Sequence, residues 1–420
     1  MTSSSQPVFV IVGASLAGAK AAEALREAGF TGRLVLVGEE IDRPYERPPL
    51  SKGYLLGKDE RDKAHVHGPH WYAEHDVELL LGVRATDLDA KSHTLTLDGF
   101  EPLRYDKLLL TTGSRVRRLG LAGEELHGVR YLRTLPEADA LLDDLRATGP
   151  AGPLRVVVVG AGWIGLETAA AAREHGAAVT VVELDELPLH RVLGRELATV
   201  FADLHRAHGV EFHFSSTVDR FEGTGGRVGG VVLSDGTQLP ADLAVVGVGI
   251  TPATELAETA GLRVSNGIVT DASLRTSDPD IFAAGDVANF HSQLVGKPVR
   301  VEHWSNALNG GPAAARAMLG EDVVYDRVPY FFTDQYDLGM EYAGYVEPGG
   351  YDRVVFRGDV PGREFIAFWV KDGRVLAGMN VNVWDVQDDI QKLVRAGYAG
   401  TAVDLDRLAD PAVPLADLSS

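Results

Sequence analysis

Near the start of the chain, an unbroken apolar run precedes a turn that contains two glycines. Residues 8–12 form the run Val-Phe-Val-Ile-Val, and the turn Gly-Ala-Ser-Leu-Ala-Gly occupies residues 13–18. A continuous apolar run predicts a strand that is buried on both faces, as in a parallel sheet covered by helices. An alanine-rich helical segment and a second apolar strand then lead to Glu39. The order strand, glycine turn, helix, strand and acid predicts a dinucleotide-binding unit.

Each position of this first turn has a physical role in such a unit. Gly13 lets the backbone turn sharply out of the strand, and Gly18 lets the helix approach the strand closely. The helix N-terminus directs free N–H groups at a pyrophosphate. Ser15 stands where the G-x-G-x-x-G pattern has its middle glycine, so the match is weakened without being broken. Taken alone, the turn is also compatible with an ordinary strand-turn-helix of an α/β core.

The same pattern returns in the second quarter of the chain. Its parts are an apolar strand at 155–159, an unbroken G-x-G-x-x-G turn at 160–165, a helix to about His175 and a strand at 178–182 that ends in Glu183. Two copies of one nucleotide-binding unit in one chain are much harder to explain by chance than a single copy. The sequence therefore predicts two dinucleotide-binding domains.

The pattern changes again toward the C-terminus. Residues 244–252 predict another buried strand, and Asp286 closes a short strand in the segment 276–286. A carboxylate at the C-terminal edge of a parallel sheet lies where such sheets bind ligands, although a helix-capping aspartate is the alternative. From residue 330 onward, strands and hairpins precede an amphipathic helix over 386–396, with Asp385 as its N-cap. We expect an α/β protein with two Rossmann-like domains and a C-terminal α+β domain.

Composition and charge restrict the partners of the protein. Its 420 residues, 45% hydrophobic and 24% charged, suffice for two or three globular domains. The formal net charge of −20 disfavours nucleic acids and anionic membranes as partners. Residues 1–8 carry no basic side chain, so the first apolar run is better interpreted as a buried strand than as a signal peptide. We expect a cytoplasmic protein without a membrane span.

The chain contains no cysteine. This excludes a disulfide, an iron–sulfur cluster bound by this chain and a catalytic dithiol. Four histidines lie close together in the sequence, namely His65, His67, His70 and His75. Their spacing matches no common zinc motif and no cysteine can complete a ligand shell, so we expect no metal site.

The chain resembles the two-dinucleotide-binding flavoprotein reductases, and specifically the ferredoxin reductases of bacterial oxygenase systems. The resemblance spans nearly the whole sequence. The motifs that carry it are residues 13–18 with Glu39, 47–52, 110–113, 131–134, 160–167, 276–286, 301–304 and 334–336. The segments Pro-Pro-Leu-Ser-Lys at 48–52 and Asp-Gln-Tyr at 334–336 are specific to this branch of the family.

The resemblance implies a division of the chain and a set of cofactor contacts. FAD would be bound by residues 1–118 and 250–325 and NADH by 119–249, with a C-terminal α+β domain at 326–420. The flavin contacts implied by motif match are Gly13, Ser15, Ala17, Gly18, Glu39, Arg47, Lys52, Ala85, Thr112, Gly113, Arg133, Asp286, Glu302 and Trp304. The NAD contacts are Gly160, Gly162, Ile164, Gly165, Glu183, Arg191 and Gly249.

The resemblance also implies roles for several of these side chains. Asp286 would hold the ribityl chain and Trp304 would lie near the isoalloxazine. Lys52 beside the flavin would stabilise the negative charge that arrives with a hydride, and Glu167 would hold the ammonium in place. An ordinary ion pair at a domain boundary is the alternative for these two residues. Glu183 would accept hydrogen bonds from the adenine ribose and repel the 2′-phosphate of NADPH, so NADH is the expected cofactor.

Without cysteine, electrons cannot leave the flavin through a thiol pair. We therefore expect delivery of single electrons to a [2Fe-2S]-type ferredoxin that serves an oxygenase, such as a cytochrome P450 or a Rieske dioxygenase. Rubredoxin, a quinone, monodehydroascorbate and oxygen are alternative acceptors, and a slow-turnover signalling flavoprotein is an alternative of another class. We expect a monomer or a weak homodimer.

Overall fold

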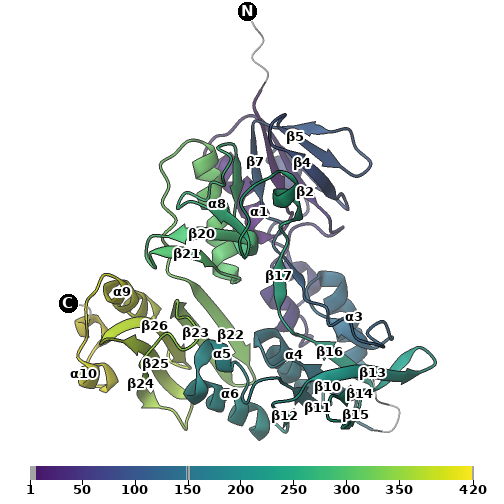
Figure 1. Cartoon of the computed structure of the whole chain (residues 1–420), viewed down its shortest axis with the longest axis vertical. Coiled ribbons are helices and arrows are strands. Elements are labelled where there is room, and N and C mark those ends of the chain that lie inside the picture. Colours follow the sequence, from purple (N-terminus) through teal and green to yellow (C-terminus); the bar gives the residue numbers. More distant parts are fainter. Residues whose placement is uncertain (1–5, 148, 150–151, 419–420) are drawn as a thin grey trace, which may run out of the picture. The chain divides into compact units, whose positions relative to one another are not determined.

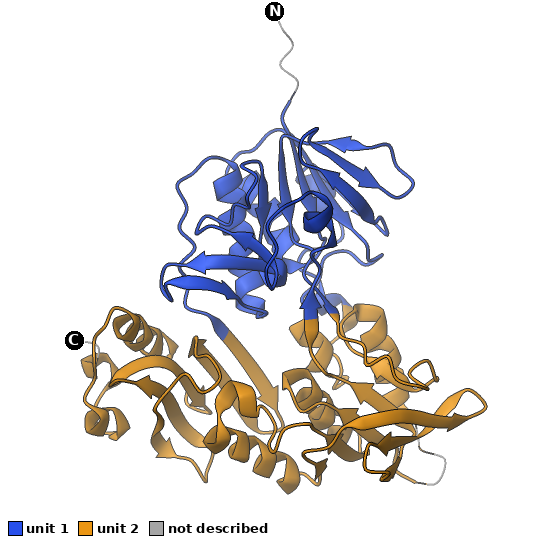
Figure 2. Cartoon of the chain, in the orientation of Figure 1, with its two compact units in different colours: residues 1–46, 62–115, 251–330 blue, residues 47–61, 116–250, 331–420 orange. Residues whose placement is uncertain are grey.

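The computed structural model describes residues 6–147, 149 and 152–418. The chain divides into two compact units (Figure 2). Unit 1 comprises Met1–Glu46, Asp62–Arg115 and Thr251–Tyr330, and unit 2 comprises Arg47–Arg61, Val116–Ile250 and Phe331–Ser420. Each unit is thus assembled from segments that are far apart in the sequence.

Unit 1 is built on a sheet of five strands in the order β19-β7-β1-β2-β3, and all four pairings are parallel. The strands are β1 (Val8–Val12), β2 (Arg33–Gly38), β3 (Val77–Leu81), β7 (Lys107–Leu110) and β19 (Ile281–Ala283). The strand β1 lies at the centre, and its last four residues are buried. The first apolar run therefore forms the doubly covered parallel strand that its composition predicts.

Two long helices of unit 1 pack against each other, namely α1 (Leu16–Glu27) and α8 (Trp304–Met318) (Figure 1). Their approach depends on a glycine, since a Cβ atom on Gly311 would lie 2.2 Å from the carbonyl oxygen of Ala17. The smaller elements are η2 (Arg61–Ala64), α2 (Trp71–Glu74), β4 (Ala85–Asp89), β5 (Thr94–Leu97), β6 (Leu103–Arg104), α7 (Glu255–Thr259), β18 (Ile268–Thr270), η3 (Gly285–Val287), β20 (Ala288–Ser292) and β21 (Lys297–Arg300).

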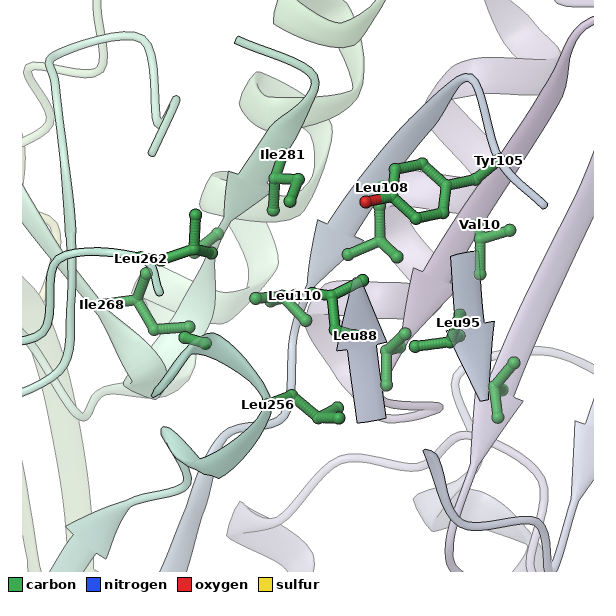
Figure 3. Packing of buried hydrophobic residues seen from close by; sticks show 14 of the residues in the cluster. Val10, Leu88, Leu95, Tyr105, Leu108, Leu110, Leu256, Leu262, Ile268 and Ile281 are labelled. Atoms are coloured by element: carbon green, nitrogen blue, oxygen red, sulfur yellow. The ribbon is translucent and has the colours of Figure 1, made fainter. Parts of the chain in front are cut away.

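An apolar cluster joins one face of the parallel sheet of unit 1 to these smaller elements (Figure 3). Val10 and Leu108 come from the sheet, Leu88 and Leu95 from the small antiparallel sheet, and Ile268 from β18. All five side chains are at most 1% exposed. The last segment of unit 1 in the sequence, which ends at Tyr330, is thereby held on the same core as the first.

We expect Gly311→Ala to lower the stability of unit 1 by about 1 to 3 kcal/mol, because the new methyl group meets the backbone of α1. Gly310→Ala is a matched control in the same helix, since its Cβ would have no neighbour closer than 3.6 Å and alanine favours a helix. The thermal unfolding midpoint measures both. Equal midpoints for the two variants would contradict this interpretation of the α1–α8 contact.

Unit 2 contains a second parallel sheet of five strands, in the order β12-β11-β10-β16-β9. Its strands are β9 (Val129–Tyr131), β10 (Arg155–Val159), β11 (Ala178–Val182), β12 (Glu211–His213) and β16 (Leu243–Val246). The other elements of this region are η1 (Pro48–Ser51), α3 (Leu135–Arg146), α4 (Trp163–Glu174), α5 (His190–Leu193), α6 (Arg195–Ala207), β13 (Val218–Thr224), β14 (Arg227–Leu233) and β15 (Gln238–Pro240). The repeated sequence pattern thus produces the repeated parallel sheet that it predicts.

The C-terminal part of unit 2 is an antiparallel sheet covered by helices. The sheet order is β22-β23-β26-β25-β24. Its elements are β22 (Tyr330–Gln335), β23 (Leu338–Gly344), β24 (Arg353–Asp359), β25 (Glu364–Lys371), β26 (Arg374–Val381), α9 (Gln387–Tyr398), α10 (Leu405–Ala409) and η4 (Leu415–Leu418). The helix α9 approaches β26 closely at Gly397, whose Cβ would lie 2.0 Å from the carbonyl oxygen of Val375. The expected fold class, two Rossmann-like sheets and a C-terminal α+β domain, is confirmed.

Two local predictions are wrong. The segment 244–252 is not one strand, because it breaks between β16 and β17 (Ile250–Pro252), where Gly249 has a φ of +98°. Asp385 does not cap α9, since it lies outside the helix with a φ of +61° and Val386 is the N-cap residue.

Two short strands lie where the chain passes from one unit to the other. These are β8 (Ser114–Val116) and β17.

Candidate functional site

The first glycine turn joins β1 to α1 in unit 1. Gly13 has a φ of +121°, and a Cβ atom there would lie 2.1 Å from the carbonyl oxygen of Thr111. A Cβ on Gly18 would lie 2.2 Å from the carbonyl oxygen of Gly13. Only glycine therefore allows both the turn and the close approach of helix and strand.

The N-terminus of α1 has no side-chain cap. Its N-cap residue Ser15 is extended, and the serine side chain makes no capping hydrogen bond. The helix α3, by contrast, begins with a capping box in which Thr134 and Glu137 satisfy each other's backbone N–H groups. The uncapped N–H groups of α1 and its positive dipole end fit a pyrophosphate, so the residues present fit a dinucleotide at this turn.

Two of the remaining flavin candidates of unit 1, Glu39 and Trp304, each contact a charged side chain. Glu39 is an exposed residue just after β2, and its Oε2 lies 3.2 Å from a guanidinium nitrogen of Arg115. The indole N–H of Trp304 donates to Glu46 at 2.8 Å. Asp286 lies in the turn η3, three residues past the C-terminal end of β19.

Two of the other candidates in this unit make side-chain contacts. Thr112 donates its hydroxyl proton to the carbonyl oxygen of Ala253 at 2.7 Å, and Glu302 forms an ion pair with Arg300. Ala85 is the first residue of β4, Ala17 is buried in the first turn of α1, and Gly113 has a φ of +67°.

The second glycine turn joins β10 to α4 in unit 2. Gly160 has a φ of +98°, and a Cβ on Gly165 would lie 2.0 Å from the Gly160 carbonyl oxygen. At Gly162, by contrast, an added Cβ would have no described atom within 4 Å. Gly160 and Gly165 are thus required by the fold, whereas the open space beside Gly162 fits the close approach of a phosphate. The helix α4 also begins without a side-chain cap.

Glu183 connects the end of β11 to this turn. Its Oε2 accepts the backbone N–H of Ala161 at 2.6 Å, and its Oε1 accepts the N–H of Asp185 at 2.9 Å. An ionised carboxylate has about four acceptor positions, so each oxygen can still accept a hydrogen bond from a hydroxyl group. The turn therefore carries a fixed negative charge at the place where a ribose is expected.

Around this turn, the other NAD candidates are accessible. Ile164 is 44% exposed, Gly249 lies in the break after β16, and Arg191 pairs with Asp185 at 2.8 Å. Arg191 also lines a surface pocket together with Tyr351 of the C-terminal sheet domain. Tyr351 was not predicted to lie near this site, because nothing in the sequence places it beside Arg191.

Lys52 and Glu167 form a buried ion pair within unit 2. The Lys52 Nζ lies 2.7 Å from Glu167 Oε1, and the two side chains are 14% and 3% exposed. Lys52 follows the turn η1, and Glu167 lies on α4, which packs against that turn. The proline-rich motif at 48–52 thus brings Lys52 to the helix that follows the second glycine turn.

Two hydroxyl groups also hold the Glu167 carboxylate. Ser51 donates to Glu167 Oε2, and Thr333 of β22 donates to Oε1 at 2.5 Å. A buried charge is stable only when it is paired and hydrogen-bonded, and this carboxylate meets both conditions. Thr333 was not predicted from the sequence, since it lies 166 positions from Glu167 in the chain.

Arg47 and Arg133 also lie together in unit 2, where the Arg47 guanidinium donates to the carbonyl oxygen of Arg133. The backbone N–H of Arg133 donates to Glu137 at 2.9 Å. The start of η1 is thereby joined to the capping box of α3.

Two of the four histidines singled out in the sequence, His67 and His75, stack on Trp71. The rings of His67 and Trp71 are 3.9 Å apart and nearly parallel, and Trp71 stacks on His75 at 4.3 Å. Burial lowers the pKa of His67. In the part of the chain that the structure describes, no three His, Asp or Glu side chains gather as metal ligands do. No helix among the same residues is long and apolar enough to cross a membrane.

In each of the two parallel sheets, the central strand leads through a glycine turn into a helix without a side-chain cap. This arrangement defines the class of proteins that bind two dinucleotides. Residues 8–311 match the family model "Pyridine nucleotide-disulphide oxidoreductase", and residues 330–419 match "Reductase C-terminal". The chain belongs to the pyridine nucleotide-disulphide oxidoreductase family, and it is a flavoprotein oxidoreductase.

Several relatives are similar over nearly their whole length. The putidaredoxin reductase of Pseudomonas putida is 39% identical over 378 residues, which are 89% of this chain and 88% of the relative. The ferredoxin–NAD(+) reductase component of the anthranilate 1,2-dioxygenase system of Burkholderia cepacia is 39% identical over 408 residues, 97% and 98% of the two chains. A crystal structure of the covalent putidaredoxin reductase–putidaredoxin complex matches with a TM-score of 0.91, 36% identity and 97% of each chain covered.

Proposed function

We propose that the protein is an NADH-dependent ferredoxin reductase of a bacterial oxygenase system. The observation that carries this proposal is the presence of two turns that fit a pyrophosphate in a chain without any cysteine. The relative from Burkholderia cepacia is named for ferredoxin, NAD(+) and a dioxygenase system, which supports the same three assignments. The putidaredoxin complex of the similar structure supports a small electron-transfer protein as the partner.

In this proposal the cofactors divide between the domains. Residues 1–118 and 250–325 bind FAD, residues 119–249 bind NADH, and residues 326–420 form the C-terminal domain. When bound, FAD would supply the redox chemistry, namely hydride acceptance from NADH and the delivery of single electrons. The protein functions in the cytoplasm, where NADH is available.

The residues of the chain supply binding and electrostatics. The first turn, through Gly13, Ser15 and Gly18, holds the FAD pyrophosphate, and Asp286 holds the ribityl chain. Lys52 stabilises the negative charge that develops when hydride is transferred, and the buried Glu167 keeps the ammonium group in place. In a site that excludes water such a fixed charge acts more strongly than it would in solution.

A reconstituted assay tests the proposed function. Purified protein loaded with FAD is mixed with NADH and cytochrome c as reporter, and a [2Fe-2S] ferredoxin, rubredoxin or no carrier is added. We expect rapid reporter reduction only with the ferredoxin, because single-electron delivery needs a matched carrier. Equal rates with rubredoxin or without a carrier would contradict the proposal.

A further inference from the structure

The segment Thr-Asp-Gln-Tyr at 333–336 has no role in the function proposed so far. Thr333 and Gln335 alternate along β22 and therefore share one face of the strand. Each side chain is 1% exposed. Buried polar groups are costly unless they are hydrogen-bonded, so their partners explain why polar residues occupy this face.

A continuous row of hydrogen bonds leads from these residues to Glu167 within unit 2. Gln335 Nε2 donates to the Thr333 hydroxyl at 3.1 Å, and that hydroxyl donates to Glu167 Oε1 at 2.5 Å. On the other side, Gln335 Oε1 lies 2.8 Å from Nε2 of His205. The row ends at Tyr336, whose hydroxyl lies 3.3 Å from His205 Nδ1.

With a neutral His205, only one arrangement of protons satisfies every bond in this row. The carboxylate paired with Lys52 can only accept, so Thr333 gives it its one hydroxyl proton and must itself accept from Gln335. The amide NH₂ of Gln335 then faces Thr333, and its carbonyl oxygen faces His205. His205 must therefore carry a proton on Nε2.

The environment of His205 agrees with this assignment. The side chain is fully buried, and burial lowers the pKa of His205 to about 4, so the ring is neutral near pH 7. A neutral imidazole has one N–H and one acceptor nitrogen. With the proton on Nε2, Nδ1 accepts the hydroxyl proton of Tyr336.

We propose that Thr333, Gln335 and His205 are positioning residues for the ion pair of Lys52 and Glu167. The C-terminal domain thereby fixes one oxygen of a carboxylate on α4, and that oxygen is the one that holds the ammonium group. A carboxylate without this contact could rotate and carry Lys52 with it. Small displacements of a charged group reduce its effect on a reaction strongly. This inference rests on the role that the proposed function gives to Lys52.

A pair of substitutions at Thr333 tests the positioning role. Thr333→Val keeps the shape but removes the hydroxyl, and we expect flavin reduction by NADH in stopped flow to slow about tenfold, with the Kd for NADH unchanged. Thr333→Ser restores the hydroxyl and should stay within about twofold of the wild-type rate. Equal rates for Thr333→Val and the wild type would overturn the proposal. Equal losses in both variants would do so as well, because they would indicate a packing role.

A double variant tests whether Thr333 acts through Lys52. In a Lys52→Met background, Thr333→Val should cause no further loss, since the group that it positions is gone. Additive losses would overturn the proposal. If Lys52→Met alone leaves the rate of flavin reduction unchanged, the proposed role of Lys52 is wrong. The hydrogen-bond row is then tested by a second measurement that does not depend on Lys52.

The second readout is the protonation of His205, which does not depend on electron transfer. In ¹⁵N-histidine NMR spectra the signals assigned by comparison with His205→Gln should show a neutral ring with its proton on Nε2. Thr333→Val lets the amide of Gln335 rotate and should therefore change these signals, whereas Thr333→Ser should preserve them. A proton on Nδ1 in the wild type, or signals that do not respond to Thr333→Val, would overturn the proposal.

Discussion

Lys52→Ala is expected to slow the reduction of bound FAD by NADH about 10- to 100-fold while FAD remains bound. The ammonium group is mostly buried and held 2.7 Å from Glu167, so the variant removes a charge whose place is fixed. Stopped-flow measurement of flavin absorbance at saturating NADH isolates this step from electron delivery to the acceptor.

Lys58→Ala provides the control for this prediction. Lys58 is an exposed lysine of the same loop region, six positions further along. Its removal changes the net charge of the protein equally, so we expect the wild-type rate of flavin reduction. An unchanged rate in Lys52→Ala would assign the buried pair to structure alone, and FAD loss in that variant would assign Lys52 to cofactor binding.

The backbone of the two dinucleotide-binding regions was predictable because it depends on local signals. Apolar runs such as 156–159 are typical of strands that are buried on both faces, as in a covered parallel sheet. Glycines such as Gly160 mark places where a side chain would collide with the backbone. These constraints are written in a few consecutive residues, and the structure confirms the sheets that they predict.

The wrong predictions have equally local causes. The break in 244–252 arises at Gly249, which takes a positive φ although the residues on both sides are typical of strands. Asp385 is a common N-cap residue, but its positive φ places it before the start of α9. In both cases the residue type permits two backbone conformations, and the contacts of the surrounding structure decide between them.

The candidate site was only partly predictable from the sequence. Lys52 and Glu167 were found through the family resemblance, and their contact depends on the packing of η1 against α4. Thr333 could not be found in this way, because threonine in a strand is ordinary and its partner is distant in the chain. No alternation in the sequence marks Thr333 and Gln335 either, because Asp334 between them is also polar.

The preference for NADH is the second large effect that we expect. Glu183 keeps a negative charge beside the second glycine turn through its bonds to the N–H groups of Ala161 and Asp185. A 2′-phosphate brought to this place would meet that charge, whereas ribose hydroxyls can donate to it. Losing one charge-assisted hydrogen bond costs roughly 1.5 to 3 kcal/mol, or about tenfold to a hundredfold in affinity. We therefore expect kcat/KM for NADH to exceed that for NADPH by at least about tenfold.

Glu183→Gln tests the cause of this preference. The variant keeps the shape of the side chain and removes its charge, so kcat/KM should fall with NADH and rise with NADPH, and the ratio between the two should narrow. Glu211→Gln is the control, because Glu211 is an exposed acid at the start of the neighbouring strand β12 and should leave the ratio unchanged. Glu183 also accepts a hydrogen bond from the backbone N–H of Ala161, so the substitution could weaken the turn itself. Thermal unfolding is therefore measured in parallel: a lower unfolding midpoint indicates a weakened turn, whereas an unchanged midpoint with a narrower cofactor ratio indicates the loss of the charge alone. Equal use of both cofactors by the wild type, or an unchanged ratio in Glu183→Gln, would show that Glu183 does not determine the choice.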